Sequence, residues 1–495
     1  MSTFMGLEAS KRGLFTQQAA LHTTGHNIAN ANTDGYSRQR VTMQTTPAYP
    51  GTGMNAPKMP GQLGTGVEAG TIERMRDDFT DRQFRQEANK FGYWQSRSSA
   101  ISQLEDVMNE PSEYGLAKSM DEFWKSLQDL SVNPENSGAR AVVVQRGVAV
   151  TESFSYISRS ISALKADYGS ELEVAGKDVN AILQNISDLN RQIQEVEPNG
   201  YLPNDLYDAR DSLIDELSAY MPIDIETIKT GGGALAIAEG GVKISLKTSN
   251  GPVVLVDGQT VHEVAVNKTD DNVTGLTVGT EDVPVGNLLQ SGKVRALINS
   301  YGYQEAGGEP KGLYNDMLAK LDDLASEFAT KFNAVHQSGT DLNGDAGLAF
   351  FENMDSAATI SVNEALLENS NLLAASDSAP GSAEAGNGNN ARNLADVKSA
   401  TITIDGKATT AQTYYQGIIG ELGVEGQQAA RMAHNSETLQ LAVAERRASY
   451  SSVSLDEEMT NMVTFQQAYN ANARMITVVD EMLDKIINGM GRVGL

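Results

Sequence analysis

Two histidines near the N-terminus, His22 and His26, are spaced so that one helical turn could present both imidazoles to a zinc ion. The metalloprotease pattern H-E-x-x-H also requires a glutamate after the first histidine, and this sequence lacks it. The other histidines, at positions 262, 336 and 434, are scattered along the chain. We therefore interpret the pair as ordinary helix residues and predict no metal site.

Four carboxylates share part of one face of a predicted helix: Asp205, Asp208, Asp211 and Asp215. Paired carboxylates can act as general acid and base, but in a chain this acidic a solvated face, tempered by Arg210, is the better interpretation. The sequence also has no G-x-S-x-G nucleophile elbow and no phosphate-binding loop that ends in Lys-Ser or Lys-Thr. It predicts no enzyme, no catalytic residue and no bound cofactor.

The stretch "DLNGDAGLAFFE" resembles a calcium-binding loop more closely than any other part of the chain. Asp341, Asn343 and Asp345 occupy positions 1, 3 and 5 of an EF-hand-like loop, and Glu352 occupies position 12. Position 6, where the loop needs glycine for a sharp turn, is Ala346. Asp, Asn and Gly also form ordinary turns, so we interpret this stretch as a turn and keep a calcium loop as the alternative.

Composition excludes several classes of partner. The chain has 495 residues, a formal net charge of −26 and a pI of about 4.6, so a largely acidic surface repels nucleic acid and anionic membranes. We expect no nucleic-acid partner and no insertion into a membrane, because no apolar run is long enough to span a bilayer. The N-terminus lacks the pattern of a cleaved secretory signal. The chain contains no cysteine, which excludes disulfides and thiolate chemistry.

Apolar residues recur every seven positions at both ends of the chain, which is typical of helices that pair as in a coiled coil. The N-terminal series consists of Leu7, Leu14, Leu21 and Ile28. The C-terminal series consists of Leu455, Met462, Tyr469, Ile476 and Leu483. Alternate positions of the N-terminal seam hold Lys11, Gln18 and Gly25, so this helix needs a partner to be stable.

Between the ends, the periodicity predicts helices in the segments 74–108, 119–130, 141–168, 172–196, 204–220, 313–335 and 427–495, with a break near 450–454. Residues 222–285 are rich in β-branched residues and in Gly-Gly, Asn-Gly and Asp-Gly turns, which indicates β-hairpins. Residues 43–66 and 376–393 are predicted loops.

The resulting fold class is mainly α with an inserted β module (α+β), in an elongated, multidomain chain whose N- and C-terminal helices pair in a coiled-coil-like core. We expect three parts. Residues 1–60 with 450–495 form a terminal helical assembly core, residues 61–221 with 286–449 form a helical middle domain, and residues 222–285 form the inserted β module.

The end of the first helix carries three asparagines before an Asp-Gly turn, in "GHNIANANTDGYSRQR". We expect Asn27, Asn30 and Asn32 to satisfy backbone groups and neighbours at a crowded helix end. This stretch resembles the N-terminal signature of the axial proteins of the bacterial flagellum, a class that includes rod, hook and hook-associated proteins. The continuation "YSRQR" resembles the family of hook-associated protein 1, found at the junction between hook and filament.

Four further stretches resemble the same family: "GTGVEAGTIERMRDDFTDRQFR", "FWKSLQDLSVNPENSGAR", "LNRQIQ" with "PNDLYDARDSLIDELS", and "LDEEMTNMVTFQQAYNANARMITVVDEML". The resemblance covers nearly the whole chain apart from the β segment. It implies export through the flagellar type III apparatus without a cleaved signal, and a place outside the cell in the flagellum.

The resemblance also implies partners. These are further copies of the chain in a ring, the hook protein, a second junction protein on the filament side, and an export chaperone that binds the C-terminal helix. The expected assembly interface combines the two heptad series with Asn27 and Asn30. Another axial protein of the hook or distal rod is an alternative. A calcium-dependent surface adhesin or an exported enzyme that uses the β module is a further one.

Overall fold

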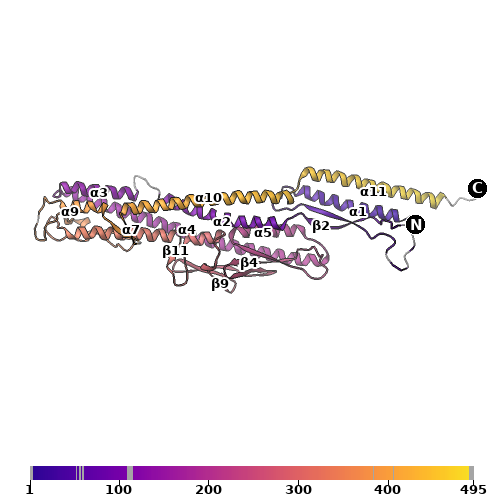
Figure 1. Cartoon of the computed structure of the whole chain (residues 1–495), viewed down its shortest axis with the longest axis horizontal. Helices are drawn as coiled ribbons and strands as arrows, with labels where there is room; N and C mark the ends of the chain where they lie inside the picture. The colour runs from indigo at the N-terminus through magenta and orange to yellow at the C-terminus, as the bar shows by residue number, and fades with distance from the viewer. Residues whose placement is uncertain are drawn as a thin grey trace, which may run out of the picture.

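The protein is a long rod with both described chain ends at one end of it (Figure 1). The computed structural model describes residues 4–489, apart from 52, 55, 56, 58–60, 109–114, 383 and 405. Helices run along the rod, and a β module lies against one side of it (Figure 1). The predicted fold class, mainly α with a β module and with long terminal helices that pack together, is confirmed.

Long helices build the rod and shorter ones connect them, and the bounds of the long helices agree with most of the predicted segments. They are α1 Phe4–Ala29, α2 Asp78–Val107, α3 Leu116–Val132, α4 Ser137–Val196, α5 Asn204–Tyr220, α6 Lys293–Tyr301, α7 Leu313–Ser338, α8 Glu364–Glu368, α9 Asn389–Asp396, α10 Ala411–Ser451 and α11 Leu455–Gly489. The two predicted segments 141–168 and 172–196 form one helix, α4, of 60 residues. It spans about 90 Å at 1.5 Å per residue.

Short strands account for the β structure. They are β1 Gln39–Thr45, β2 Val67–Arg74, β3 Ile223–Ile228, β4 Gly241–Thr248, β5 Gly251–Asp257, β6 Thr260–Val261, β7 Val264–Thr269, β8 Asn272–Val278, β9 Glu281–Pro284, β10 Tyr303–Gln304, β11 Pro310–Lys311, β12 Phe351–Glu352, β13 Ser361–Val362, β14 Ile402–Ile404 and β15 Lys407–Thr409. The predicted hairpins form two sheets, β3-β4-β5-β6 and β11-β10-β8-β7, with β9 on β8.

Three predicted boundaries were wrong. The segment 43–66 is not all loop, because its first residues belong to β1, which pairs antiparallel with β2. The predicted loop 376–393 contains the start of α9, and α10 begins at Ala411 rather than near residue 427. Pairing with β2 and packing of α10 along α2 are tertiary interactions, which local composition does not encode.

Two asparagine side chains attach the β module to α4. Each side-chain amide bonds both the N–H and the C=O of one strand residue, as a neighbouring strand would. The Asn180 side chain donates to the Val264 carbonyl and accepts from the Val264 amide, at 2.9 and 2.8 Å. About three helical turns further along α4, the fully buried Asn190 makes the same pair of bonds with Val242. The segment that holds β3 to β9 begins and ends at neighbouring points, because a Cβ added at Gly292 would lie 2.5 Å from the Tyr220 carbonyl oxygen.

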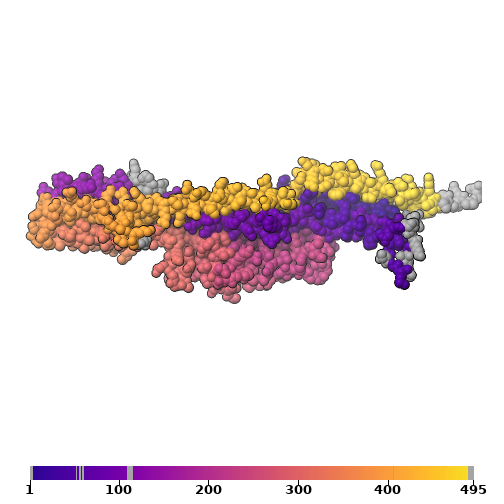
Figure 2. Space-filling view, in the orientation of Figure 1, coloured from indigo at the N-terminus to yellow at the C-terminus, as the bar shows by residue number. Residues whose placement is uncertain are grey.

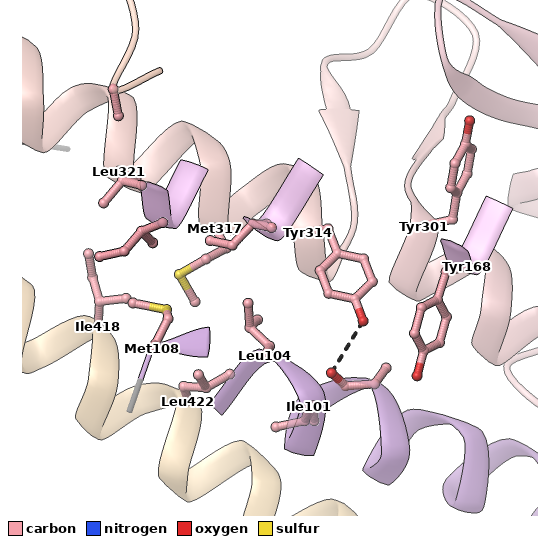
Figure 3. Close-up of a cluster of buried hydrophobic side chains, with 14 of the residues drawn as sticks. Ile101, Leu104, Met108, Tyr168, Tyr301, Tyr314, Met317, Leu321, Ile418 and Leu422 are labelled. Carbon is pink, nitrogen blue, oxygen red and sulfur yellow. Dashed lines mark hydrogen bonds between the residues drawn. The ribbon is translucent and has the colours of Figure 1, made fainter. Parts of the chain in front are cut away.

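The core of the rod lies where α2, α7 and α10 meet. Figure 3 shows Ile101 and Leu104 of α2, with Met108 directly after it, between Met317 and Leu321 of α7 and the side chains of α10. The Tyr314 hydroxyl in this core donates to the Ala100 carbonyl at 3.3 Å, which satisfies a buried polar group (Figure 3). This apolar core joins α10, late in the chain, to the early helix α2.

An aromatic cluster fills the end of the rod opposite the chain ends and encloses one histidine. Its rings are Phe123, Trp124, Phe154, Phe328, Phe332, Phe350 and Phe351. His336 is fully buried beside it, with Nδ1 2.6 Å from the Leu348 carbonyl and Nε2 accepting from the Ala374 amide at 3.0 Å. Burial lowers the pKa of His336 to about 4, against the hydrogen bond to Leu348, which raises it.

We expect this end of the rod to lose stability in mild acid. The unfolded chain binds a proton at His336 near pH 6.5, and the folded chain binds it only near pH 4. The stability that neutral His336 contributes is therefore complete above pH 6.5 and is lost as the pH falls towards 4. The loss is on the order of 3 kcal/mol. Urea unfolding followed by Trp124 fluorescence in a Trp94→Phe background would measure it. His336→Gln, which keeps an uncharged donor and acceptor, should flatten the pH dependence, and an unchanged slope would contradict this.

Candidate functional site

The terminal helices α1 and α11 pack against each other in opposite directions at the end of the rod (Figure 1). Asn27 near the end of α1 donates to Glu458 near the start of α11 at 3.1 Å. A Cβ added at Gly13, earlier in α1, would lie 2.9 Å from the side chain of Asn472, later in α11. These two contacts fix the antiparallel register, and Gly13 permits the helices to approach closely.

The buried face of α1 differs from the leucine series. It consists of small and polar residues: Gly13, Thr16, Ala20, Thr23, Thr24 and Asn27. The predicted interface residues Leu7, Leu14, Leu21 and Ile28 are only half-buried. On α11, Met462, Tyr469, Ile476 and Leu483 are half-buried and Leu455 is exposed. Much of the apolar surface of both series is therefore uncovered in the single chain.

The asparagine corner holds the turn that follows α1. The Asn27 amide donates to the Gln39 carbonyl and its oxygen accepts from the Gln39 amide and the Tyr36 hydroxyl, at 2.8, 2.9 and 2.8 Å. The Asn30 side chain donates to the His26 carbonyl at 3.1 Å. Both therefore satisfy backbone groups, as predicted, whereas Asn32 is exposed. His26 lies 3.0 Å from the Tyr36 hydroxyl and His22 is exposed.

Arg38 connects this corner to the break between α10 and α11. Its guanidinium binds Glu457 and Glu458 at 2.9 and 2.8 Å, and its backbone amide donates to the Ser451 carbonyl at 2.8 Å. The segment after α1 is thus attached to the last residue of α10 and to the first turn of α11. These contacts set the direction in which α11 leaves the rod.

A buried group of charges lies next to this corner, and we call it the arginine–carboxylate cluster. Its cations are Arg74, Arg76, Arg85, Arg210 and Arg447, and its anions are Asp81, Asp208, Asp211, Asp215 and Glu239. The prediction of a solvated acidic face on α5 was wrong for three of its four carboxylates. Only Asp205 is strongly exposed, because the other three face arginines from β2, α2 and α10.

The cluster joins segments that are far apart in the sequence. Asp208 binds Arg74 at 2.7 Å and accepts from the Ser37 amide at 2.9 Å. Asp215 binds Arg85 of α2 at 2.7 Å and Arg447 of α10 at 2.5 Å. Glu239 lies in the connection between β3 and β4 and forms ion pairs with Arg74 and Arg210. The cluster therefore also attaches the β module. We call the place where the terminal helices meet the rest of the rod its base. The ion pairs of the cluster connect all of these segments there, so that the base is one charged joint.

Electrostatics in the cluster favour the charged forms of Asp211 and Arg74, whereas burial lowers the pKa of Arg210. Burial alone would raise the pKa of Asp211, but Arg76, Arg74 and Arg85 outweigh it and lower that pKa to about 2. Burial alone would lower the pKa of Arg74, but Asp211, Glu239 and Asp208 raise it well above its usual range. Sequence reasoning missed Arg74, Arg76 and Arg85. Their only signal was a series of arginines at short spacing, matched by aspartates three and four residues apart in α5.

The loop that resembles an EF-hand forms a turn. The Asp341 carboxylate accepts from the backbone amides of Asn343 and Asp345, both at 2.8 Å. Glu352 lies in β12, where its carboxylate accepts from the Asn363 side chain at 2.6 Å. Among the described residues, no three or more histidine, aspartate or glutamate side chains gather in a way that could hold a metal ion. Within the same residues, no helix has the length and apolarity needed to cross a membrane.

Comparison with known proteins first shows to which class of proteins the two terminal segments belong. Residues 7–36 match the family model of flagellar basal body rod proteins, and residues 446–489 match that of the C-terminal region of the FlgE, FlgF and FlgG rod proteins. These two segments contain most of α1 and α11, together with the asparagine corner. The terminal helices are therefore those of flagellar axial proteins.

The middle of the chain narrows the class to one family. Residues 101–351 match the helical domain of flagellar hook-associated protein FlgK. The chain is 45% identical to flagellar hook-associated protein 1 of Bacillus subtilis over 99% of both chains. It is 27% identical to hook-associated protein 1 of Salmonella typhimurium, over 68% of this chain and 58% of the other. This chain belongs to the family of flagellar hook-associated protein 1, structural proteins of the hook–filament junction.

A solved structure shares the fold. The flagellar hook junction protein FlgK from Burkholderia pseudomallei superimposes with a TM-score of 0.61, over 75% of this chain and 100% of that chain, at 13% identity. At this identity the likeness concerns the fold alone. It is consistent with a rod of long helices that carries β structure at its side.

We predict that Asp211→Asn destabilises the base of the rod by about 3–5 kcal/mol, because it leaves Arg74 and Arg76 buried without a full counter-charge. Urea denaturation of the purified full-length chain would measure the loss. Glu216→Gln is the matched control, since Glu216 is an exposed residue of the same helix. It should change stability by less than about 0.5 kcal/mol. Equal midpoints for the two variants would mean that the cluster does not stabilise the base.

Proposed function

We propose that this chain is a self-assembling subunit that forms a ring between hook and filament, and that α1 and α11 are its assembly core. The observation that supports this most is the incomplete burial of the apolar series on both helices. A pair of helices that leaves leucine, isoleucine and methionine half-exposed gains free energy when other chains cover them. The residues proposed for this contact remain Leu7, Leu14, Leu21, Ile28, Asn27 and Asn30 of the N-terminal part and Leu455, Met462, Tyr469, Ile476 and Leu483 of α11.

The proposed role is structural and requires no catalytic group. In the proposed arrangement the terminal helices line the inside of the tube, while the rest of the rod and its β module lie further out. The hook protein contacts the ring on one side and a second junction protein contacts it on the filament side. Family membership supports these partners.

The same proposal includes secretion. The chain leaves the cell through the flagellar type III apparatus, and an export chaperone binds α11 before assembly. An uncovered apolar helix needs such protection in the cytoplasm, because exposed apolar surface promotes aggregation. The absence of cysteine is compatible with export in an unfolded form, since no disulfide has to be broken or formed.

We predict that Leu14→Asp or Ile476→Asp yields a folded, monomeric protein that no longer supports filaments on hooks. A carboxylate without a partner in an apolar contact costs several kcal/mol, whereas the rod core does not depend on these residues. Electron microscopy of a deletion strain that expresses each variant would count filaments, and the culture medium would report export. Thr464→Asp, at an exposed polar position of α11, is the control and should assemble.

Two results would overturn the proposal. Normal filaments in the deletion strain would exclude a role at the junction. Normal filaments with both secreted variants would exclude the terminal helices as the assembly core.

A further inference from the structure

A cavity of about 600 Å³ opens on the side of the rod between α2, α7 and α10, and residues of α6 and of the hairpin β10-β11 complete its lining. Its inner wall is the margin of the apolar core, where Met317, Ile418 and Leu422 are buried (Figure 3). Its outer side is open to solvent, because Glu421 and Gln428 are exposed and α10, in orange, lies on the outside of the rod (Figure 2). The described lining residues lie outside α1 and α11, so the cavity is separate from the proposed assembly core.

Three aromatic side chains line the cavity beside this apolar margin. Tyr93 and Trp94 follow each other in α2, and their rings meet at 90° with centroids 5.2 Å apart. Tyr303 of β10 is the third, and the Arg295 guanidinium lies over its ring, 5.1 Å from the centroid. Trp94 is half-buried, so part of its indole surface remains accessible from the cavity. Such a flat apolar surface can pack against the C–H face of a sugar ring.

Two amide side chains form part of the polar side of the cavity. Asn299 Nδ2 donates to the Tyr93 hydroxyl and to Gln290 Oε1, at 3.2 and 2.8 Å. Asn299 is only 9% exposed, and its Oδ1 is buried without a hydrogen-bond partner among the described residues. A buried acceptor without a partner costs free energy, so a ligand hydroxyl that donates to this oxygen is favoured. The amides therefore indicate a ligand that brings hydrogen-bond donors.

The charged residues of the lining balance one another. Three are cations and three are carboxylates: Arg97, Lys311, Lys320, Asp316, Glu421 and Glu425. Arg97 binds Glu425 at 3.1 Å. Lys320 binds Glu421 at 2.6 Å, so four of the six side chains are already paired. The whole chain has a formal net charge of −26, whereas this lining has none, which favours a neutral polar ligand over an ion.

We propose that this cavity binds a short, neutral saccharide. A sugar ring has a C–H face that packs on an aromatic ring, and Trp94 supplies that ring. The hydroxyls of a sugar both donate and accept hydrogen bonds, which suits the unpaired Asn299 oxygen and the ion pairs of the wall. The volume falls within the range of cavities that hold small organic ligands. This inference is independent of the proposed self-assembly, and either can fail without the other.

Binding of saccharides to the purified full-length chain tests the inference. Isothermal titration would use four neutral tetrasaccharides, built from glucose, galactose, mannose or N-acetylglucosamine. We expect at least one of them to bind with a Kd below about 1 mM. The same saccharide should change the fluorescence of Trp94, whereas Trp124 is buried, does not line the cavity and provides a constant background.

Two variants with matched controls assign the site. Trp94→Leu keeps apolar bulk but removes the aromatic face, so it should weaken binding at least about ten-fold. Its control is Tyr156→Leu, since Tyr156 is an exposed aromatic residue of α4 outside the lining, and the affinity should not change. Gln428→Ala removes an exposed lining amide that the fold does not need, and it should weaken binding several-fold. Gln427→Ala, at the exposed position beside it, should leave binding unchanged.

The salt dependence of binding distinguishes a neutral ligand from a charged one. Raising the salt concentration from about 0.05 M to about 0.5 M should leave the affinity within about two-fold, because screening acts on charged ligands. Three results would overturn the inference: no binding of any of the four tetrasaccharides, equal binding by the natural chain and both lining variants, or a marked loss of affinity with salt. The proposed function would survive each of them, because it is tested by the filaments of the deletion strain.

Discussion

Buried charge at the base of the rod is the constraint on which the rest of the structure depends. An arginine without a counter-charge is costly in an apolar interior, so the carboxylates of α5 must lie where β2, α2 and α10 bring their arginines. Each ion pair is directional, and together they fix the relative positions of segments that are hundreds of residues apart. The apolar core further along the rod holds helices together, but such contacts are less selective about angle. The direction of the terminal helices is set by the charged joint and by Arg38 beside it.

The pairing of α1 with α11 is of another kind. Its buried face is small and polar, with a close approach at Gly13 and a shared hydrogen bond between Asn27 and Glu458. Such a face gives register rather than much stability, because threonine and alanine bury little apolar area. The larger side chains lie at its margins, where a single chain covers them only in part. A weak but well-registered pair suits a subunit whose final contacts are made with other chains.

Periodicity predicted the helices and the β module because both depend on local patterns. The sequence shows these patterns directly: the seven-residue series at the two ends, the apolar residues in steps of three and four in 172–196, and the Gly-rich turns of 222–285. The site was predicted less well. Asn27 and Asn30 were found at their corner, but Asp208, Asp211 and Asp215 were interpreted as solvated, since their arginine partners lie about 130 residues away or further. The buried face of α1 was also missed, because glycine and threonine carry no hydrophobic signal.

The segment that holds β3 to β9 begins and ends at neighbouring points of the chain's path, where Gly292 approaches the Tyr220 carbonyl. A segment with adjoining ends behaves as a cassette, since lengthening or exchanging it leaves the chain on either side in place.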